Sequence, residues 1–214
     1  MKGAFTLLEA LVIIVVTSVL VSIAIASYGD PDELYLARDQ IIRHIRYTQH
    51  LAVMDDKFDP NDPFWERKKW RIIFGSSMYP EYAGGIEYGW TYTIFADLDN
   101  KGNHSPTTGE IAVDPYTKRL LTGGYGVGSK LKSSDPKAIP EMALWHWRIE
   151  KFEHSSACNQ SIAFDEIGRP YTLSTDSDSL RLITQTCKYT LIHQNKEAAS
   201  ICIEPETGYT HECD

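Results

Sequence analysis

The sequence predicts an α+β fold in which a long N-terminal α-helix packs on an antiparallel β-sheet or a small β-sandwich. Three observations support this class: an apolar segment long enough to span a membrane comes first, a segment with helical periodicity follows, and short β-type segments alternate with turns in the remainder. The chain has 214 residues, so the part after the apolar segment can form one ordinary domain with a buried core.

The apolar segment runs from Ala10 to Tyr28 without a charged residue. Its length is about that needed to cross ~30 Å of hydrocarbon as an α-helix. Glu9 lies at its N-terminal edge, where an ionised carboxylate costs roughly 2–3 kcal/mol in lipid. A secretory signal peptide is one alternative, but the small pair at positions 3 and 4 precedes the apolar run instead of following it. A plain membrane anchor is another alternative, and it leaves Glu9 unexplained.

Residues 3–9, Gly-Ala-Phe-Thr-Leu-Leu-Glu, resemble the processing site of type IV pilins and type II secretion pseudopilins. In that family a prepilin peptidase cuts before a Phe, the new amino group is methylated, and the fifth residue of the mature chain is a Glu. The resemblance implies cleavage between Ala4 and Phe5, N-methylation of Phe5 and a role for Glu9 in subunit assembly. Cleavage after Gly3 is the alternative, which would make Glu9 the sixth residue.

The resemblance also divides the chain into a leader peptide (1–4), a transmembrane helix with the assembly motif (5–29) and a periplasmic pilin-like globular domain (30–214). It implies a single-pass inner-membrane protein that later enters a pseudopilus or a pilus. The implied partners are other pilin or pseudopilin subunits, the prepilin peptidase and an inner-membrane assembly platform. Looser matches in the soluble part are most similar to H-type minor pseudopilins and related minor pilins.

The function implied is that of a structural minor pseudopilin or minor pilin, in protein secretion or pilus assembly. These residues do not separate a type II secretion pseudopilus from a type IV pilus. The alternative function is a membrane-anchored periplasmic binding module, which would need neither processing nor Glu9. An enzyme is not expected, because the sequence has no HExxH or GxSxG motif.

A second helical half is predicted from Asp32 to Met54. Its apolar positions recur every three or four residues and should face the domain: Leu34, Ala37, Ile41, Ile45, Thr48 and Ala52. Pro31 leaves both an unbroken and a kinked rod possible. Residues 55–68 hold two prolines and many charges and are predicted to form a loop.

The rest of the chain is predicted to be short strands joined by turns. The predicted strands are 69–74, 90–96, 111–113, 144–152, 161–164, 180–184, 188–193 and 200–204. Residues 165–170 and 206–209 are predicted to be turns, and residues 123–140 a long insertion.

Four cysteines lie in the C-terminal part of the chain, and none forms a CxxC pair, which argues against zinc. A turn centred between Thr207 and Gly208 places Cys202 opposite Cys213, so these two are expected to form a disulfide. Cys158 and Cys187 then pair by elimination. Disulfides persist in the oxidising periplasm that the resemblance implies.

Charge and motifs restrict the remaining ligands. The net charge of −8 disfavours binding to nucleic acid. Asp97, Asp99 and Asn100 resemble the start of a calcium loop, but Lys101 occupies a usual ligand position. A solvated loop without metal is therefore expected there, with calcium as the weaker alternative and no other cofactor.

Overall fold

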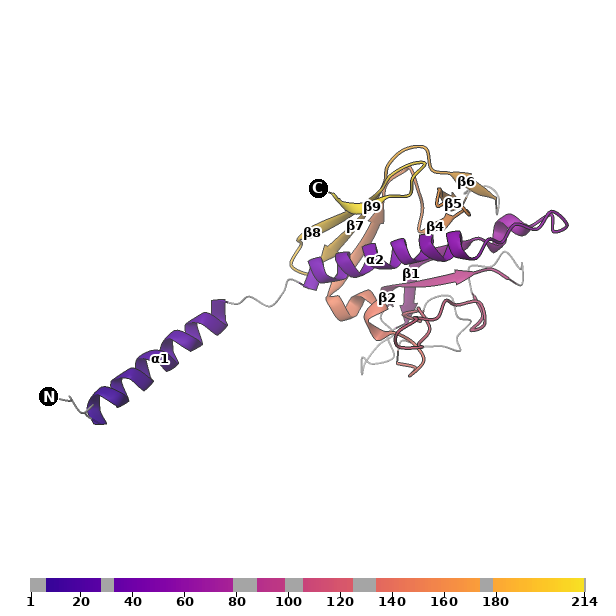
Figure 1. Cartoon of the computed structure of the whole chain (residues 1–214). Helices are drawn as coiled ribbons and strands as arrows, with labels where there is room; N and C mark the ends of the chain where they lie inside the picture. Colours follow the sequence, from indigo (N-terminus) through magenta and orange to yellow (C-terminus); the bar gives the residue numbers. More distant parts are fainter. Residues whose placement is uncertain are drawn as a thin grey trace. The chain divides into compact units, whose positions relative to one another are not determined.

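The computed structural model describes residues 7–27, 33–78, 88–98, 106–124, 134–173 and 179–213. It shows an α+β protein with two α-helices and two antiparallel β-sheets (Figure 1). The chain separates into two compact units, Met1–Glu33 and Leu34–Asp214. Helix α1 (Leu7–Ser27) belongs to the first unit, and nearly all of helix α2 (Glu33–Met54) belongs to the second.

Helix α2 matches the predicted second helical half to within one residue. All six residues of the predicted apolar stripe are buried, and Ile42 is buried beside them. Apolar residues three and four positions apart lie on one side of a helix, so one face can be buried while the other stays polar. The sequence pattern was sufficient here because it was regular over the whole helix.

The first sheet has five strands in the order β2-β1-β4-β5-β6, and every neighbouring pair is antiparallel. Its strands are β1 (Trp70–Met78), β2 (Tyr88–Ala96), β4 (Ser161–Phe164), β5 (Pro170–Leu173) and β6 (Leu180–Leu182). The second sheet has four antiparallel strands in the order β3-β7-β8-β9. They are β3 (Ile149–His154), β7 (Cys187–His193), β8 (Ala198–Ile203) and β9 (Thr210–Cys213).

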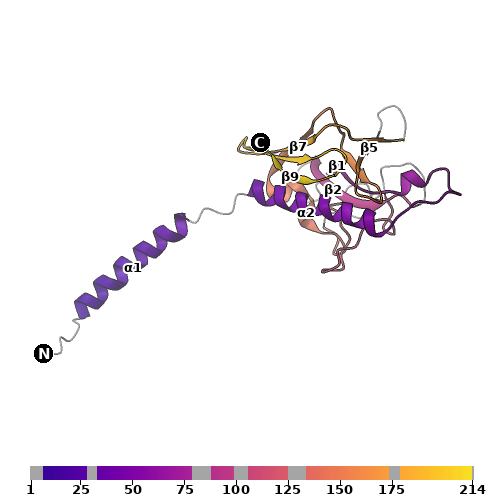
Figure 2. The same cartoon turned by 45° about the horizontal axis from the view of Figure 1, so that its top comes forward.

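Helix α2 and both sheets bury side chains in one hydrophobic core. At its centre Phe74 of β1 stacks on Phe152 of β3, with ring centroids 4.3 Å apart. Tyr189 of β7 lies within 5.1 Å of both rings, so aromatic packing joins the two sheets. In both views α2 runs alongside β1, β2 and β9 (Figures 1 and 2).

Polar contacts fix α2 on two sides. Towards β2, the Tyr92 hydroxyl accepts a hydrogen bond from Gln40 Nε2 at 2.9 Å and lies 2.8 Å from His44 Nδ1. Towards β9, the Arg46 guanidinium donates twice to the Thr210 carbonyl, at 3.0 and 2.7 Å. Near the end of α2, Gln49 Nε2 donates to the carbonyls of Gly168 and Thr207, both at 2.8 Å. The helix therefore holds both predicted turns in place.

Several predicted elements differ from the structure. Residues 111–113 form isolated bridges, with Ile111 opposite Phe95, instead of a strand. The predicted strand 144–152 begins as a 3-10 helix, η3 (Leu144–Trp147), which follows η2 (Pro140–Met142), and only its end belongs to β3. The predicted loop 55–68 ends in another 3-10 helix, η1 (Trp65–Lys68). Strands β5 and β9 were not among the predicted strands.

Candidate functional site: an apolar helix and a carboxylate-lined cleft

The first candidate site is helix α1, whose side chains are exposed from Leu7 to Ser22. The large apolar side chains between Leu7 and Val21 are from 49% exposed, at Ile13, to 86% exposed, at Leu7. Leu, Ile and Val occupy every face of the helix, so turning one face towards a protein surface would leave the others in water. A helix that is apolar all round is stable when lipid or other protein chains surround it.

Three hydroxyl groups of α1, those of Thr17, Ser18 and Ser22, are satisfied within the helix. Thr17 Oγ1 donates to the Ile13 carbonyl at 2.7 Å, Ser18 Oγ to Val15 at 2.8 Å, and Ser22 Oγ to Ser18 at 2.8 Å. Such bonds to the carbonyls three or four residues earlier leave no hydroxyl proton pointing outwards. The polar residues of this stretch, apart from Glu9, are therefore compatible with apolar surroundings.

Glu9 lies in the first turn of α1 and is the only charged residue of the helix. A carboxylate at this end is favoured by the partial positive charge of the helix N-terminus. Ala4 and Phe5, the residues of the predicted cleavage and methylation site, lie outside the described residues. Within the part of the chain that is described, no helix is both long enough and apolar enough to cross a membrane.

The two predicted disulfides are present in the globular unit. Cys158–Cys187 joins the segment before β4 of the first sheet to the start of β7 in the second, with Cα atoms 5.5 Å apart. Cys202–Cys213 joins β8 to the edge strand β9, with Cα atoms 5.7 Å apart. The hairpin register is not the predicted one, because Cys213 lies opposite Ser200 and Cys202 opposite His211. The cysteines still meet diagonally across the pair of strands.

The predicted calcium loop is only partly described. Asp97 is 3% exposed and follows β2, whereas Asp99 and Asn100 lie outside the described residues. Burial lowers the pKa of Arg71 on the neighbouring strand to about 10, and the negative charge of Asp97 opposes this shift. Among the described residues, no group of three or more His, Cys, Asp or Glu side chains could hold a metal ion. Asp97 thus interacts electrostatically with the Arg71 guanidinium. The expectation of a loop without calcium remains a prediction, because Asp99 and Asn100 lie outside the described residues.

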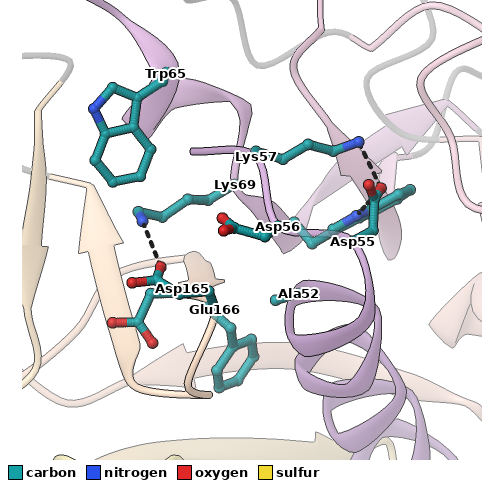
Figure 3. A pocket seen from close by; sticks show the side chains of 10 residues that line it. Ala52, Asp55, Asp56, Lys57, Trp65, Lys69, Asp165 and Glu166 are labelled. Carbon is teal, nitrogen blue, oxygen red and sulfur yellow. Dashed lines mark hydrogen bonds and ion pairs between the residues drawn. The ribbon is translucent and has the colours of Figure 1, made fainter. Parts of the chain in front are cut away.

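The second candidate site is a cleft between the end of α2, loop 55–69 and the turn after β4 (Figure 3). It is lined by Ala52, Asp55, Asp56, Lys57, Trp65, Lys69, Trp70, Phe164, Asp165 and Glu166. Its free volume is about 10 Å³, far below the ~300–1,000 Å³ typical of small-molecule sites. The cleft therefore has room for about one water molecule.

Charged groups of the cleft are mostly paired with one another. Asp55 forms an ion pair with Lys57 and accepts a 2.9 Å hydrogen bond from Trp70 Nε1. These interactions lower the pKa of Asp55, although its partial burial acts in the opposite direction. The Asp56 carboxylate points into the cleft in Figure 3 and accepts the Phe58 backbone N–H at 2.8 Å. A backbone amide orients this carboxylate without neutralising it.

Lys69 is the buried cation of the cleft. Its Nζ lies 4.1 Å from the centre of the Trp65 ring, 5.7 Å from that of Tyr171 and 3.6 Å from Glu166 Oε2. Aromatic faces and a carboxylate can together stabilise an ammonium that has lost its water. Lys69 therefore fastens loop 55–69 to the turn after β4.

The cleft was not predicted from the sequence. Its walls are about a hundred residues apart in the chain, and residues 55–68 were interpreted as a loop without a role. One signal was available, since Phe58, Phe64 and Trp65 are large aromatic residues within an otherwise polar loop. Aromatic residues in such a loop are more typical of a contact surface than of a solvated connection.

Comparisons of the chain with family models, with curated proteins and with solved structures found no match.

Proposed function

We propose that this chain is a structural subunit of a pilin-like fibre, a minor pseudopilin or minor pilin anchored in the inner membrane before assembly. The observation that carries the proposal is the motif of residues 3–9 directly before an apolar helix with one carboxylate, Glu9. The structure adds two supporting features: the hydroxyls of Thr17, Ser18 and Ser22 bond back to their own helix, and α2 packs on antiparallel sheets.

The chemistry of the motif explains how subunits would associate. Cleavage between Ala4 and Phe5 by a prepilin peptidase creates a cationic amino group at the start of the apolar helix. In a fibre this amine can lie beside Glu9 of a neighbouring subunit, where opposite charges in a low-dielectric environment attract strongly. Because both groups also lose hydration, the pair contributes more to axial register than to overall stability.

The same proposal covers partners and location. The partners are other pilin or pseudopilin subunits, the peptidase and an assembly platform in the inner membrane, while the globular unit lies in the periplasm. Both disulfides are compatible with that oxidising compartment. A secretion pseudopilus and a type IV pilus remain equal alternatives within the proposal, because Glu9 and the apolar helix would serve both.

The test is the mature N-terminus of the protein isolated from its native host. Mass spectrometry should find a chain that begins at N-methylated Phe5. A chain that begins at Met1, or after the apolar helix, would contradict the proposal, and an intact Met1 would favour a membrane-anchored binding module. A second measurement uses Glu9→Ala, which should leave membrane insertion intact and reduce incorporation into fibres, with Glu9→Asp as the charge-retaining control.

A further inference from the structure

The two disulfides of the globular unit differ in how far solvent reaches them. Cys158 and Cys187 are 5% and 0% exposed and belong to the hydrophobic core. Cys202 is 7% exposed, whereas Cys213 is half-buried, and of the four cysteines of the chain, all of which are described, Cys213 alone is not buried. Thiol–disulfide exchange requires a thiolate to approach one of the two sulfurs directly. Such an approach from solvent is therefore open at Cys213 and closed at the core disulfide.

Strand β9 is held in the second sheet with little help from burial. Its sequence, Thr-His-Glu-Cys, contains no aliphatic residue and no Phe, Tyr or Trp. Within the strand Thr210 alone is buried, and its hydroxyl donates to the Gly208 carbonyl at 3.1 Å. The neighbouring strand β8 instead places Ile201 and Ile203 in the core with 0% exposure. Since β9 is the edge strand and pairs only with β8, hydrogen bonds and the disulfide hold it in place.

Strand β9 in turn contacts one side of α2. Arg38 Nη2 lies 2.5 Å from Glu212 Oε2, and the Arg38 side chain is 16% exposed. About two helical turns further on, the Arg46 guanidinium donates to the Thr210 carbonyl at 3.0 and 2.7 Å. Both arginines thus bond to β9, so these contacts persist only while β9 stays beside α2.

We propose that Cys202–Cys213 is a redox-active disulfide that exchanges with a dithiol, and that its reduction releases β9 from α2. A thiolate of the dithiol attacks Cys213 Sγ, a mixed disulfide forms there, and Cys202 Sγ leaves as a thiolate. The second thiolate of the dithiol then attacks the dithiol's own sulfur in the mixed disulfide and displaces Cys213 Sγ. Two electrons and two protons pass to the protein, and the dithiol is oxidised to a cyclic disulfide.

Reduction opens the unit at one edge and leaves its core intact. Cys158–Cys187 still joins the two sheets, and the apolar residues of α2 and β8 stay in the shared core. Arg38 and Arg46 lose their partners on β9, so the reduced form exposes two more cations on α2. Opening of this kind is local, because it removes no large apolar side chain from the core. It requires no processing at the N-terminus and is therefore independent of the proposed function.

The experiment is graded reduction of the full chain in detergent with dithiothreitol and without denaturant. N-ethylmaleimide blocks free thiols at each step, and mass spectrometry maps them. The expected result is blocked Cys202 and Cys213 in a chain that retains Cys158–Cys187, with rates of reduction at least tenfold apart. Earlier reduction of Cys158–Cys187, loss of both disulfides together, or resistance of both until urea unfolds the chain would overturn the proposal.

A second measurement follows the release of β9 with phenylglyoxal, which modifies accessible guanidinium groups. Arg43, exposed on the same helix, is the internal control. Selective reduction of Cys202–Cys213 should raise the rate of Arg38 modification at least fivefold and leave that of Arg43 unchanged. An unchanged rate at Arg38 would mean that β9 stays beside α2 after reduction, which contradicts the proposal.

Paired variants separate this release from a general loosening of the fold. Cys202→Ala with Cys213→Ala should reproduce the faster modification of Arg38 without any reductant. Cys158→Ala with Cys187→Ala is the matched control, because it also removes one disulfide but leaves β9 fastened to β8. An equal rise in the two double variants would show that losing either bridge loosens the whole unit, and the proposed switch would then be refuted.

Discussion

Helices α1 and α2 have nearly the same length, 21 and 22 residues, yet they satisfy their apolar side chains in opposite ways. In α2 the apolar residues lie on one face and are buried, as Ile41 and Ile45 show with 0% exposure. In α1 they occupy all faces, and Ile13 and Ile14 are 49 and 67% exposed. The difference shows that α2 has the pattern of a helix that packs on its own domain, whereas the apolar surface of α1 extends around the whole helix.

The polar residues of the two helices also differ in where their hydrogen-bond partners lie. Thr17 and Ser18 of α1 turn their hydroxyls back to the carbonyls of their own helix. Gln40, His44 and Gln49 of α2 instead bond to groups far away in the sequence. The polar side chains of α2 therefore help to fix one tertiary structure. The hydroxyls of Thr17 and Ser18 in α1 are instead satisfied locally, which makes them compatible with an apolar environment.

The comparison predicts its largest effect for one substitution made in both helices. Ile41→Ala leaves a cavity in the shared core and should lower the free energy of unfolding by about 2–5 kcal/mol. Ile13→Ala removes the same atoms from an exposed position and should leave that free energy unchanged. Urea unfolding of the full chain in detergent, followed by tryptophan fluorescence, measures both. An equal loss in the two variants would show that α1 is part of the cooperative globular unit.

Helix α2 was predictable from sequence because its apolar residues recur regularly, and α1 because its apolar run is long. Several strands instead depend on backbone features that the sequence does not signal. Residues 144–147 look like a strand, but the chain turns there with Arg148 in a left-handed conformation (φ 53°). Strand β5 begins at Pro170, and a proline at the first position of a strand resembles a turn residue. Whether these segments form strands is decided by tertiary packing and not by local β-propensity.

The hairpin at the C-terminus shows the same limit at the level of one contact. The disulfide Cys202–Cys213 was predicted correctly, but the pairs of β8 and β9 are shifted by two residues. The loop contains two positive φ angles, 61° at Glu206 and 64° at Gly208, and its centre lies one residue earlier than expected. The cleft could not be predicted at all, because only the folded chain brings loop 55–69 to the turn after β4.

The second prediction compares the two disulfides within the stable unit. Cys158–Cys187 spans 29 residues and Cys202–Cys213 spans 11. On the chain-entropy account, their removal should lower the free energy of unfolding by about 3.5 and about 3 kcal/mol. Paired Cys→Ala variants of each bridge, unfolded in urea, provide the measurement. A larger loss for Cys202–Cys213 would mean that fastening the edge strand β9 matters more than connecting the sheets.

The third prediction concerns acid, and its basis is the polar contact between α2 and β2. Since Gln40 donates to the Tyr92 hydroxyl, the hydroxyl proton is available to donate to His44 Nδ1, which must then be unprotonated. Burial lowers the pKa of His44 from 6.5 to about 4, the Arg43 guanidinium adds to the lowering, and the Asp114 carboxylate opposes it. Neutral His44 thus belongs to the folded state.

The direction of the pH effect follows from that pKa. Between pH 6.5 and 4 the unfolded chain binds a proton at His44 that the folded chain does not, so the contribution to stability is complete above pH 6.5 and decreases as the pH falls. At pH 5 the loss is at most about 2 kcal/mol, since His44 is partly exposed. His44→Gln should weaken this dependence in unfolding experiments from pH 7 to pH 4.5, whereas His50→Gln, at an exposed position of the same helix, should retain it. If both variants keep the wild-type slope, acid acts elsewhere, and the His44–Tyr92 contact does not limit how firmly α2 is held.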